Sequence, residues 1–217
     1  ANGGNRGIAG GLNGGLGVAE QMSGIEWALL FDQDSLALPN LMEEMQAVYR
    51  ALPHPEEVAQ ICANFVESVD GPEGYPYGRF GDSTWMESDT GQTSGTLLSL
   101  RAWRAAGRMR EDYFLYWVDV EYGLRLRQLG WRTVLTHKPL LVHHTGNARV
   151  THLLGQRVAL HEYSPARHYF LVRNHIVLLR EYAAVNPVWA FRSICSRVRK
   201  IIVTAALATG ALAGEPS

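Results

Sequence analysis

The stretch Trp27-Ala28-Leu29-Leu30-Phe31-Asp32-Gln33-Asp34-Ser35 decides the expected fold class, because an apolar run in it ends abruptly in two carboxylates. An uninterrupted apolar run predicts a strand buried on both faces, as parallel strands in α/β proteins usually are. Open α/β sheets bind their ligands outside the carboxyl ends of their strands. The position of Asp32 and Asp34 therefore predicts a ligand or metal site.

The spacing of the two carboxylates is compatible with a metal site. In an extended segment, residues i and i+2 point to the same side, so Asp32 and Asp34 are able to converge on one cation. Hard oxygen ligands suit Mg²⁺ or Mn²⁺, which commonly bridge a protein to the phosphates of a substrate. The alternative interpretation is an acidic turn at a strand end, without a metal.

Composition limits the class of protein. The chain has 217 residues, of which 47% are hydrophobic and 19% are charged, so it is large enough for one domain with a proper core. A formal net charge of −1 gives no overall attraction to nucleic acid. Cys62 and Cys195 lie far apart without metal-ligand spacing, which favours reduced thiols in the cytoplasm over a disulfide framework or a zinc site. No secretory signal or membrane-length apolar run is present.

Strands that alternate with helices along the chain indicate an α/β fold, and no internal repeat is evident. The expected strands span residues 27–31, 58–66, 93–100, 131–135 and 140–144, and the expected helices span residues 39–52, 101–107, 117–129 and 164–182. Residues 70–93 are expected to form a long irregular connection. The glycine-rich residues 1–17 suit either a backbone packed against a ligand or a flexible leader.

A second acidic cluster, Asp119-Val120-Glu121, follows the aromatic run Tyr113-Phe114-Leu115-Tyr116-Trp117. Carboxylates in the first turn of a helix interact favourably with the helix dipole, so capping is one interpretation. The other is a general base beside aromatic rings, which suit the apolar faces of sugars. Further along, His143 and His144 follow a short apolar strand, and histidine is a common ligand of transition metals. His143 is the preferred candidate of the two.

Six pieces of the chain, taken in order, resemble the inverting family 2 glycosyltransferases of the GT-A fold, especially the rhamnosyltransferase and galactofuranosyltransferase branch. They are Asn5-Arg6-Gly7-Ile8-Ala9-Gly10 with Asn13-Gly14-Gly15; Leu30-Phe31-Asp32-Gln33-Asp34-Ser35; Thr93-Ser94-Gly95; Asp119 to Arg125 with Gly130; His143-His144 with Gly146; and Ser164 to Phe170 with Arg173-Asn174. Their order and spacing carry the resemblance more than any single motif does.

The resemblance implies a role for each of these residues. Asp119 matches the catalytic base that takes a proton from the acceptor hydroxyl. Asp32, Asp34 and His143 match a set that holds a divalent ion, Mn²⁺ or Mg²⁺, against the diphosphate of a nucleotide-sugar donor. The separation of 24 residues between Asp119 and His143 agrees with this branch. The implied donor-binding residues are Asn5, Gly7, Asn13 and Asp32, and the implied acceptor-binding residues are Gly95, Trp117 and Glu121.

The activity implied by the resemblance is transfer of rhamnose or a similar sugar, from a donor such as dTDP-rhamnose to a glycan or lipid-linked acceptor, in cell-surface polysaccharide synthesis. A single displacement inverts the anomeric centre, with the cation stabilising the leaving diphosphate. The implied GT-A fold is a Rossmann-like mixed sheet flanked by helices. We expect roughly the first 60 residues of such a domain to precede Ala1, so residues 1–217 alone are expected to bind nucleotide weakly, and their activity stays open.

The expected domains are a partial GT-A domain over residues 1–155 and a C-terminal helical extension over residues 156–217. Past Pro187 the extension mixes aromatic and basic residues, and Ile201 to Ala213 is apolar. This mix fits an amphipathic helix on a membrane surface, and a helix packed on the domain is the alternative. The resemblance implies the membrane surface, because such enzymes often act on lipid-linked acceptors, and hence a cytoplasmic protein peripheral to the inner face of the membrane. Two alternatives stay open: a non-catalytic carbohydrate- or membrane-binding module derived from such an enzyme, and a nucleotidyltransferase.

Overall fold

A computed structural model describes residues 4–67, 82–143, 148–153, 156–161 and 163–208 of the protein. The chain divides into two compact units, residues 1–145 and residues 146–217. The residues predicted to form the catalytic and metal sites all belong to the first unit, and the amphipathic C-terminal helix belongs to the second.

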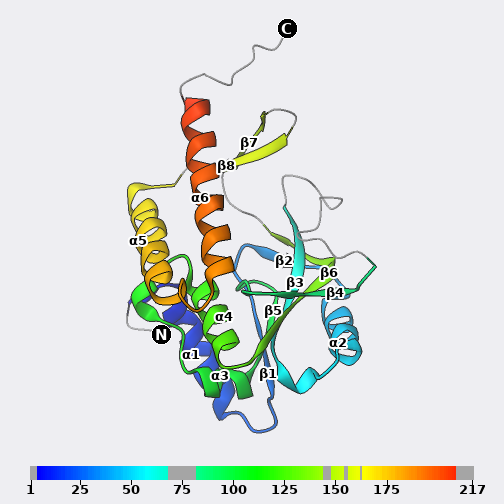
Figure 1. The fold of residues 1–217 in the computed structure, drawn as a ribbon. Coiled ribbons are helices and arrows are strands. Elements are labelled where there is room, and N and C mark those ends of the chain that lie inside the picture. Colours follow the sequence, from blue (N-terminus) through cyan, green and yellow to red (C-terminus); the bar gives the residue numbers. More distant parts are fainter. Residues whose placement is uncertain (1–3, 68–81, 144–147, 154–155, 162, 209–217) are drawn as a thin grey trace. The chain divides into compact units, whose positions relative to one another are not determined.

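The first unit is built on a six-stranded mixed sheet (Figure 1). Its strands are β1 (Trp27–Leu30), β2 (Ser35–Ala37), β3 (Val58–Glu67), β4 (Trp85–Ser88), β5 (Thr96–Ser99) and β6 (Arg132–His143). The strand order is β1-β5-β3-β6-β2, and β4 also pairs with β6. β3 and β6 are parallel, whereas the other pairs are antiparallel. The unit is therefore mixed α/β, compatible with a Rossmann-like architecture.

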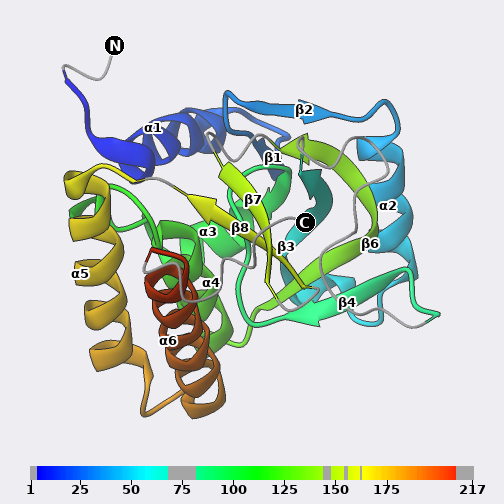
Figure 2. The same cartoon turned by 90° about the horizontal axis from the view of Figure 1, so that it is seen from above.

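Helices cover both faces of this sheet. Figure 1 and Figure 2 both show α1 (Gly7–Gln21), α3 (Leu100–Ala106) and α4 (Val118–Gln128) on one side and α2 (Leu41–Ala51) on the other. The apolar face of α2 buries Met45 and Val48 in one core cluster with Ile61 of β3 and Leu141 of β6. Burying a side chain of this size contributes about 1.5–3 kcal/mol. This layer therefore fixes α2 against the parallel strand pair.

The expectation for β1 is wrong in one respect. The strand forms where predicted, but it is not buried on both faces, because Leu29 is 39% exposed while Leu30 is 8% exposed. β1 pairs antiparallel with β5, and no strand within the described residues pairs with its other edge. Edge and central strands share the same apolar pattern, so periodicity cannot separate them. The turn after β1 nevertheless carries Asp32 and Asp34, as predicted.

Residues 7–21 form helix α1, where the sequence suggested a ligand-binding loop or a flexible leader. Glycine costs about 1 kcal/mol per helical position relative to alanine, so propensity alone disfavours this helix. Tertiary contacts override the propensity. Ala9 and Leu16 are buried, and the side chain of buried Asn13 donates to the Met109 carbonyl and accepts from the Met109 amide, both at 2.8 Å. The helix forms because one of its faces is anchored.

Most other elements form where the sequence predicts them, including α2, α3, α4 and β3. Two separate strands were predicted over residues 131–135 and 140–144, but the structure has one strand, β6, from Arg132 to His143. Residues 93–95 form a turn before β5 rather than part of the strand. β2 and β4 were not predicted. Each is only three or four residues long and is held by antiparallel pairing with β6, which no local pattern reveals.

The second unit contains the hairpin of β7 (Ala148–Leu153) and β8 (Gln156–His161), followed by α5 (Pro165–Tyr182) and α6 (Pro187–Ala208). α5 begins as predicted, since the Ser164 hydroxyl accepts a hydrogen bond from the Arg167 amide at 3.4 Å. α6 packs on α5, where His175 Nε2 lies 2.8 Å from Ser193 Oγ. None of the helices within the described residues combines the length and apolar character needed to span a membrane.

Candidate active site

Four segments bring functional groups together around Asp119. Asp32 follows β1, Cys62 lies in β3, Thr93 and Ser94 precede β5, and Asp119 lies in the first turn of α4. The Asp32 amide donates to the Ser94 hydroxyl at 3.3 Å. Asp119 lies close enough for its charge to act on the Cys62 thiol and for the charge of Asp32 to act on it. The strand pairing of the sheet therefore assembles one polar cluster.

The pKa of Asp119 is raised to about 6. Burial is the main cause, because it penalises the charged carboxylate, and the negative charge of Asp32 raises the pKa further. The backbone amides of Val120, Asp119 and Thr93 oppose this shift, and the Val120 amide donates to Asp119 Oδ1 at 2.9 Å. Such a carboxyl group is mostly ionised at neutral pH yet basic enough to accept a proton, as a general base requires.

The aromatic segment before Asp119 has a strained backbone. Phe114, Tyr116 and Trp117 have φ angles of 56°, 63° and 66°. Bulky residues rarely adopt positive φ, and each such residue costs about 1–3 kcal/mol. Strain of this kind persists only where the surroundings hold the backbone, and it clusters at active sites and ligand clamps. The segment therefore supports a functional role for the start of α4.

The beginning of α1 supports this aromatic segment. The Ile8 amide donates to the Phe114 carbonyl at 3.0 Å. Gly7 has a φ of +69°, and a β-carbon added to it would lie 2.2 Å from the Phe114 oxygen, so only glycine fits there. Nearby, Glu111 accepts from Asn13 Nδ2 at 3.1 Å. The start of α1 and the aromatic segment therefore form one structural assembly.

The predicted metal ligands belong to neighbouring strand ends. Asp32 is partly buried and Asp34 is exposed, and both lie between β1 and β2. His143 is the last residue of β6, where its backbone is in register with Ser35, the residue after Asp34. The fold thus brings the backbones of the three predicted ligands to adjacent positions. The side chain of His143 and the whole of His144 lie outside the described residues, so the choice between them stays a prediction.

The donor-binding residues predicted near the start of the chain make contacts within the fold. Asn5 Oδ1 accepts from the Gly7 amide at 3.0 Å and so supports the first turn of α1. Asn13 is 0% exposed, and its amide is engaged by Met109 and Glu111. These contacts give Asn5 and Asn13 structural roles within the fold. Contacts of Asn5, Gly7 and Asn13 with a donor stay predictions.

The three predicted acceptor residues differ in their surroundings. A β-carbon on Gly95 would lie 2.1 Å from Leu141 Cδ2, and Gly95 has a φ of +69°, so packing inside the core already requires glycine. Glu121 is 1% exposed and pairs with Arg125 at 2.8 Å, a geometry that does not favour an acceptor contact. Trp117 is partly exposed and directly precedes the helix that carries Asp119. Of the three residues, Trp117 therefore has the surroundings that best suit an acceptor contact.

Sequence reasoning did not single out Thr93 and Ser94, which contact Asp119 and Asp32. They belong to the Thr93-Ser94-Gly95 piece, of which only Gly95 was proposed as a site residue. Small polar residues in a turn give a weak local signal. Their role arises from the antiparallel pairing of β1 with β5, which places Leu30 opposite Thr96.

The sequence of the chain is similar to that of a known transferase. The chain matches no protein-family model. It is 28% identical over 190 residues to the dTDP-rhamnosyl transferase RfbF of Shigella flexneri, and the match covers 82% of this chain. The similarity supports a relationship to glycosyltransferases. The chain spans 61% of the length of that relative.

Proposed function

We propose that this protein is a metal-dependent, inverting glycosyltransferase of the family 2 type with a GT-A fold. It transfers rhamnose or a similar sugar from a nucleotide-sugar donor to a glycan or lipid-linked acceptor in cell-surface polysaccharide synthesis. The observation that carries the proposal is Asp119, a carboxyl group with a pKa of about 6 beside a second carboxylate and a strained aromatic segment. The similarity to a dTDP-rhamnosyl transferase supports the choice of reaction and of donor class.

Asp119 acts as the general base in this proposal. A sugar hydroxyl is a weak nucleophile, so a carboxylate within hydrogen-bond reach must take its proton as the oxygen attacks the anomeric carbon. The Val120 amide fixes one oxygen of the carboxylate and so orients the group. One displacement from the face opposite the leaving group inverts the anomeric centre, and no covalent enzyme intermediate forms.

Trp117 forms a wall of the acceptor pocket in this proposal. An indole ring offers an apolar face that suits the apolar face of a sugar ring. Its backbone carbonyl accepts from the Glu121 amide at 2.9 Å, so Trp117 is tied to the first turn of α4. The acceptor hydroxyl and the base are therefore positioned by the same helix start.

Asp32, Asp34 and His143 are proposed to hold Mn²⁺ or Mg²⁺. Two carboxylates one residue apart provide hard oxygen ligands, and the register of β2 with β6 brings the backbone of the histidine beside them. When bound, the ion stabilises the negative charge that develops on the leaving nucleoside diphosphate. The Ser94 hydroxyl, which accepts from the Asp32 amide, fixes the turn that carries the carboxylates.

Release of nucleoside diphosphate from a panel of nucleotide sugars, with Mn²⁺ or Mg²⁺ and an acceptor glycan, tests the proposal. Asp119→Asn should lower kcat by about 100-fold or more, because an amide cannot accept the proton. Glu43→Gln, which removes an exposed carboxylate of α2, should leave the rate unchanged.

Equal rates for Asp119→Asn and the unchanged protein would contradict the assigned base. Binding of a glycan without release from any donor would favour a non-catalytic carbohydrate-binding module. Release of pyrophosphate from a nucleoside triphosphate and a sugar phosphate would favour a nucleotidyltransferase.

A further inference from the structure

Helix α6 carries an exposed apolar stripe. Phe191, Val198 and Ile202 are 69%, 48% and 61% exposed, and their spacing places them on one side of the helix. The stripe, as defined by its exposed members, consists of Val188, Phe191, Ile194, Val198, Ile201 and Ile202. Single exposed apolar residues are common, but a contiguous set marks an interaction surface.

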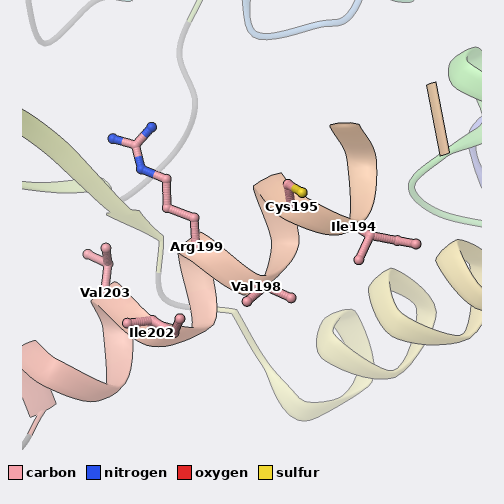
Figure 3. A pocket seen from close by; sticks show the side chains of 6 residues that line it. All are labelled: Ile194, Cys195, Val198, Arg199, Ile202 and Val203. Atoms are coloured by element: carbon pink, nitrogen blue, oxygen red, sulfur yellow. The ribbon is translucent and has the colours of Figure 1, made fainter. Parts of the chain in front are cut away.

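A hollow of about 370 Å³ lies along the middle of the stripe (Figure 3). In this view Val198 and Ile202 point to one side of α6, and the guanidinium group of Arg199 extends away from them. The residues that line the hollow are Ile194, Cys195, Val198, Arg199, Ile202 and Val203. The surface is therefore apolar along the stripe, with a basic residue at its border.

The charge on α6 has one sign. The helix contains Arg192, Arg197, Arg199 and Lys200 but no aspartate or glutamate. Arg192 lies four residues after Val188 and Arg199 lies three residues before Ile202, so both lie along the border of the stripe. Basic residues beside an apolar face are the combination that binds anionic lipid headgroups while apolar side chains enter the boundary of the acyl chains.

A second copy of the helix fits this surface less well. The apolar residues of the stripe are spaced about three and four residues apart, and this spacing also suits the packing of two helices against each other. Such a pair would bring Arg192 and Arg199 from both copies to the same seam, and α6 has no carboxylate to pair with them. Phosphates of an anionic bilayer supply the charge that a second copy of α6 lacks.

We propose that α6 docks the protein on the surface of an anionic lipid bilayer. The helix lies in the plane of the membrane, with the apolar stripe at the boundary of the acyl chains and with Arg192 and Arg199 at the level of the phosphates. This inference does not depend on sugar transfer, since it rests on the surface of the second unit alone.

Sedimentation with vesicles, without nucleotide sugar, tests the docking. The protein should bind vesicles of phosphatidylcholine mixed with phosphatidylglycerol but not vesicles of phosphatidylcholine alone, and salt should weaken the binding. Phe191→Ser combined with Ile202→Ser should weaken it by about tenfold or more. Arg192→Gln combined with Arg199→Gln should weaken it by about 25-fold, since each basic residue near the surface strengthens binding about fivefold.

Leu129→Ser is the matched control, because Leu129 is a 53% exposed apolar residue at the end of α4. It should leave vesicle binding unchanged, and circular dichroism should show equal helix content in all variants. Failure of the folded protein to bind anionic vesicles would overturn the proposal. Equal binding by the unchanged protein and by the variant with Phe191→Ser and Ile202→Ser would also overturn it. The stripe would instead be assigned to a second copy by two results together. Light scattering would show a dimer that Phe191→Ser combined with Ile202→Ser abolishes, and the protein would not bind vesicles.

Discussion

At the scale of single residues, the protonation of Asp119 should set the pH dependence of the reaction. The carboxylate is the active form, and its pKa is about 6. The value of kcat/KM should therefore rise with pH through about 6 and level off above it. A pH profile of initial rates measures this limb. A profile that stays flat across that pH would contradict a base of this pKa.

The same residue should reduce stability at neutral pH. The folded pKa of about 6 exceeds the ordinary value of 3.8, so the stabilising contribution of Asp119 is present below about pH 4 and is lost as the pH rises through 6. A two-unit shift corresponds to about 3 kcal/mol as an upper value. Asp119→Asn should therefore raise the free energy of unfolding at neutral pH by about 1–3 kcal/mol.

Denaturant unfolding of both proteins measures this difference, which should disappear near pH 4. The amide oxygen of asparagine can still accept from the Val120 amide, so the helix start is preserved in the variant. A variant that is less stable at neutral pH than the unchanged protein would contradict the raised pKa.

At the scale of elements, α1 couples its first turn to the aromatic segment. Gly7→Ala would push a β-carbon against the Phe114 carbonyl and should move the segment that positions Trp117. We expect a loss of stability of about 1–3 kcal/mol together with a lower kcat. Gly15→Ala is the control, because this glycine is exposed in the same helix with open space around it, and it should stabilise the protein by about 1 kcal/mol.

Thermal unfolding and initial rates of both variants measure these effects. A Gly7→Ala protein with unchanged stability and rate would show that the contact between α1 and the aromatic segment is not needed.

Helices α2, α3 and α4 of the first unit were predictable because each combines periodic apolar residues with an end signal. In α3, for example, Gly107 follows the last turn at a φ of +76°. β4 has no strand pattern in its sequence that would predict it. The apolar run of β1 predicts a strand but does not separate an edge strand from a central one. α1 was missed because its glycines disfavour a helix, and only the buried contacts of Asn13 and Leu16 compensate.

At the scale of the whole molecule, metal binding should stabilise the folded state. A ligand that binds only the folded state at a hundredfold excess over its dissociation constant contributes about 2.7 kcal/mol. Mn²⁺ should therefore raise the Tm, a chelator should reverse the effect, and Asp34→Asn should remove most of it. Glu43→Gln, an exposed carboxylate of α2, should keep the full shift. An equal shift in Asp34→Asn would place the metal elsewhere.

The sequence by itself determined which segments are helices or strands in most of the chain, where the carboxylates of Asp32, Asp34 and Asp119 stand along it, and that the C-terminal helix is amphipathic. These features depend on neighbours within a few residues, so a linear pattern contains them.

Only the tertiary structure decided that Asp32, Ser94 and Asp119 form one cluster, that Asp119 has a raised pKa, and that Gly7 and Gly95 are required by packing. Burial and the field of a neighbouring charge act through space, and the groups that produce them come from segments distant in the chain. The pairing of β1 with β5 and the anchoring of α1 bring these segments close together, and no local pattern specifies that proximity.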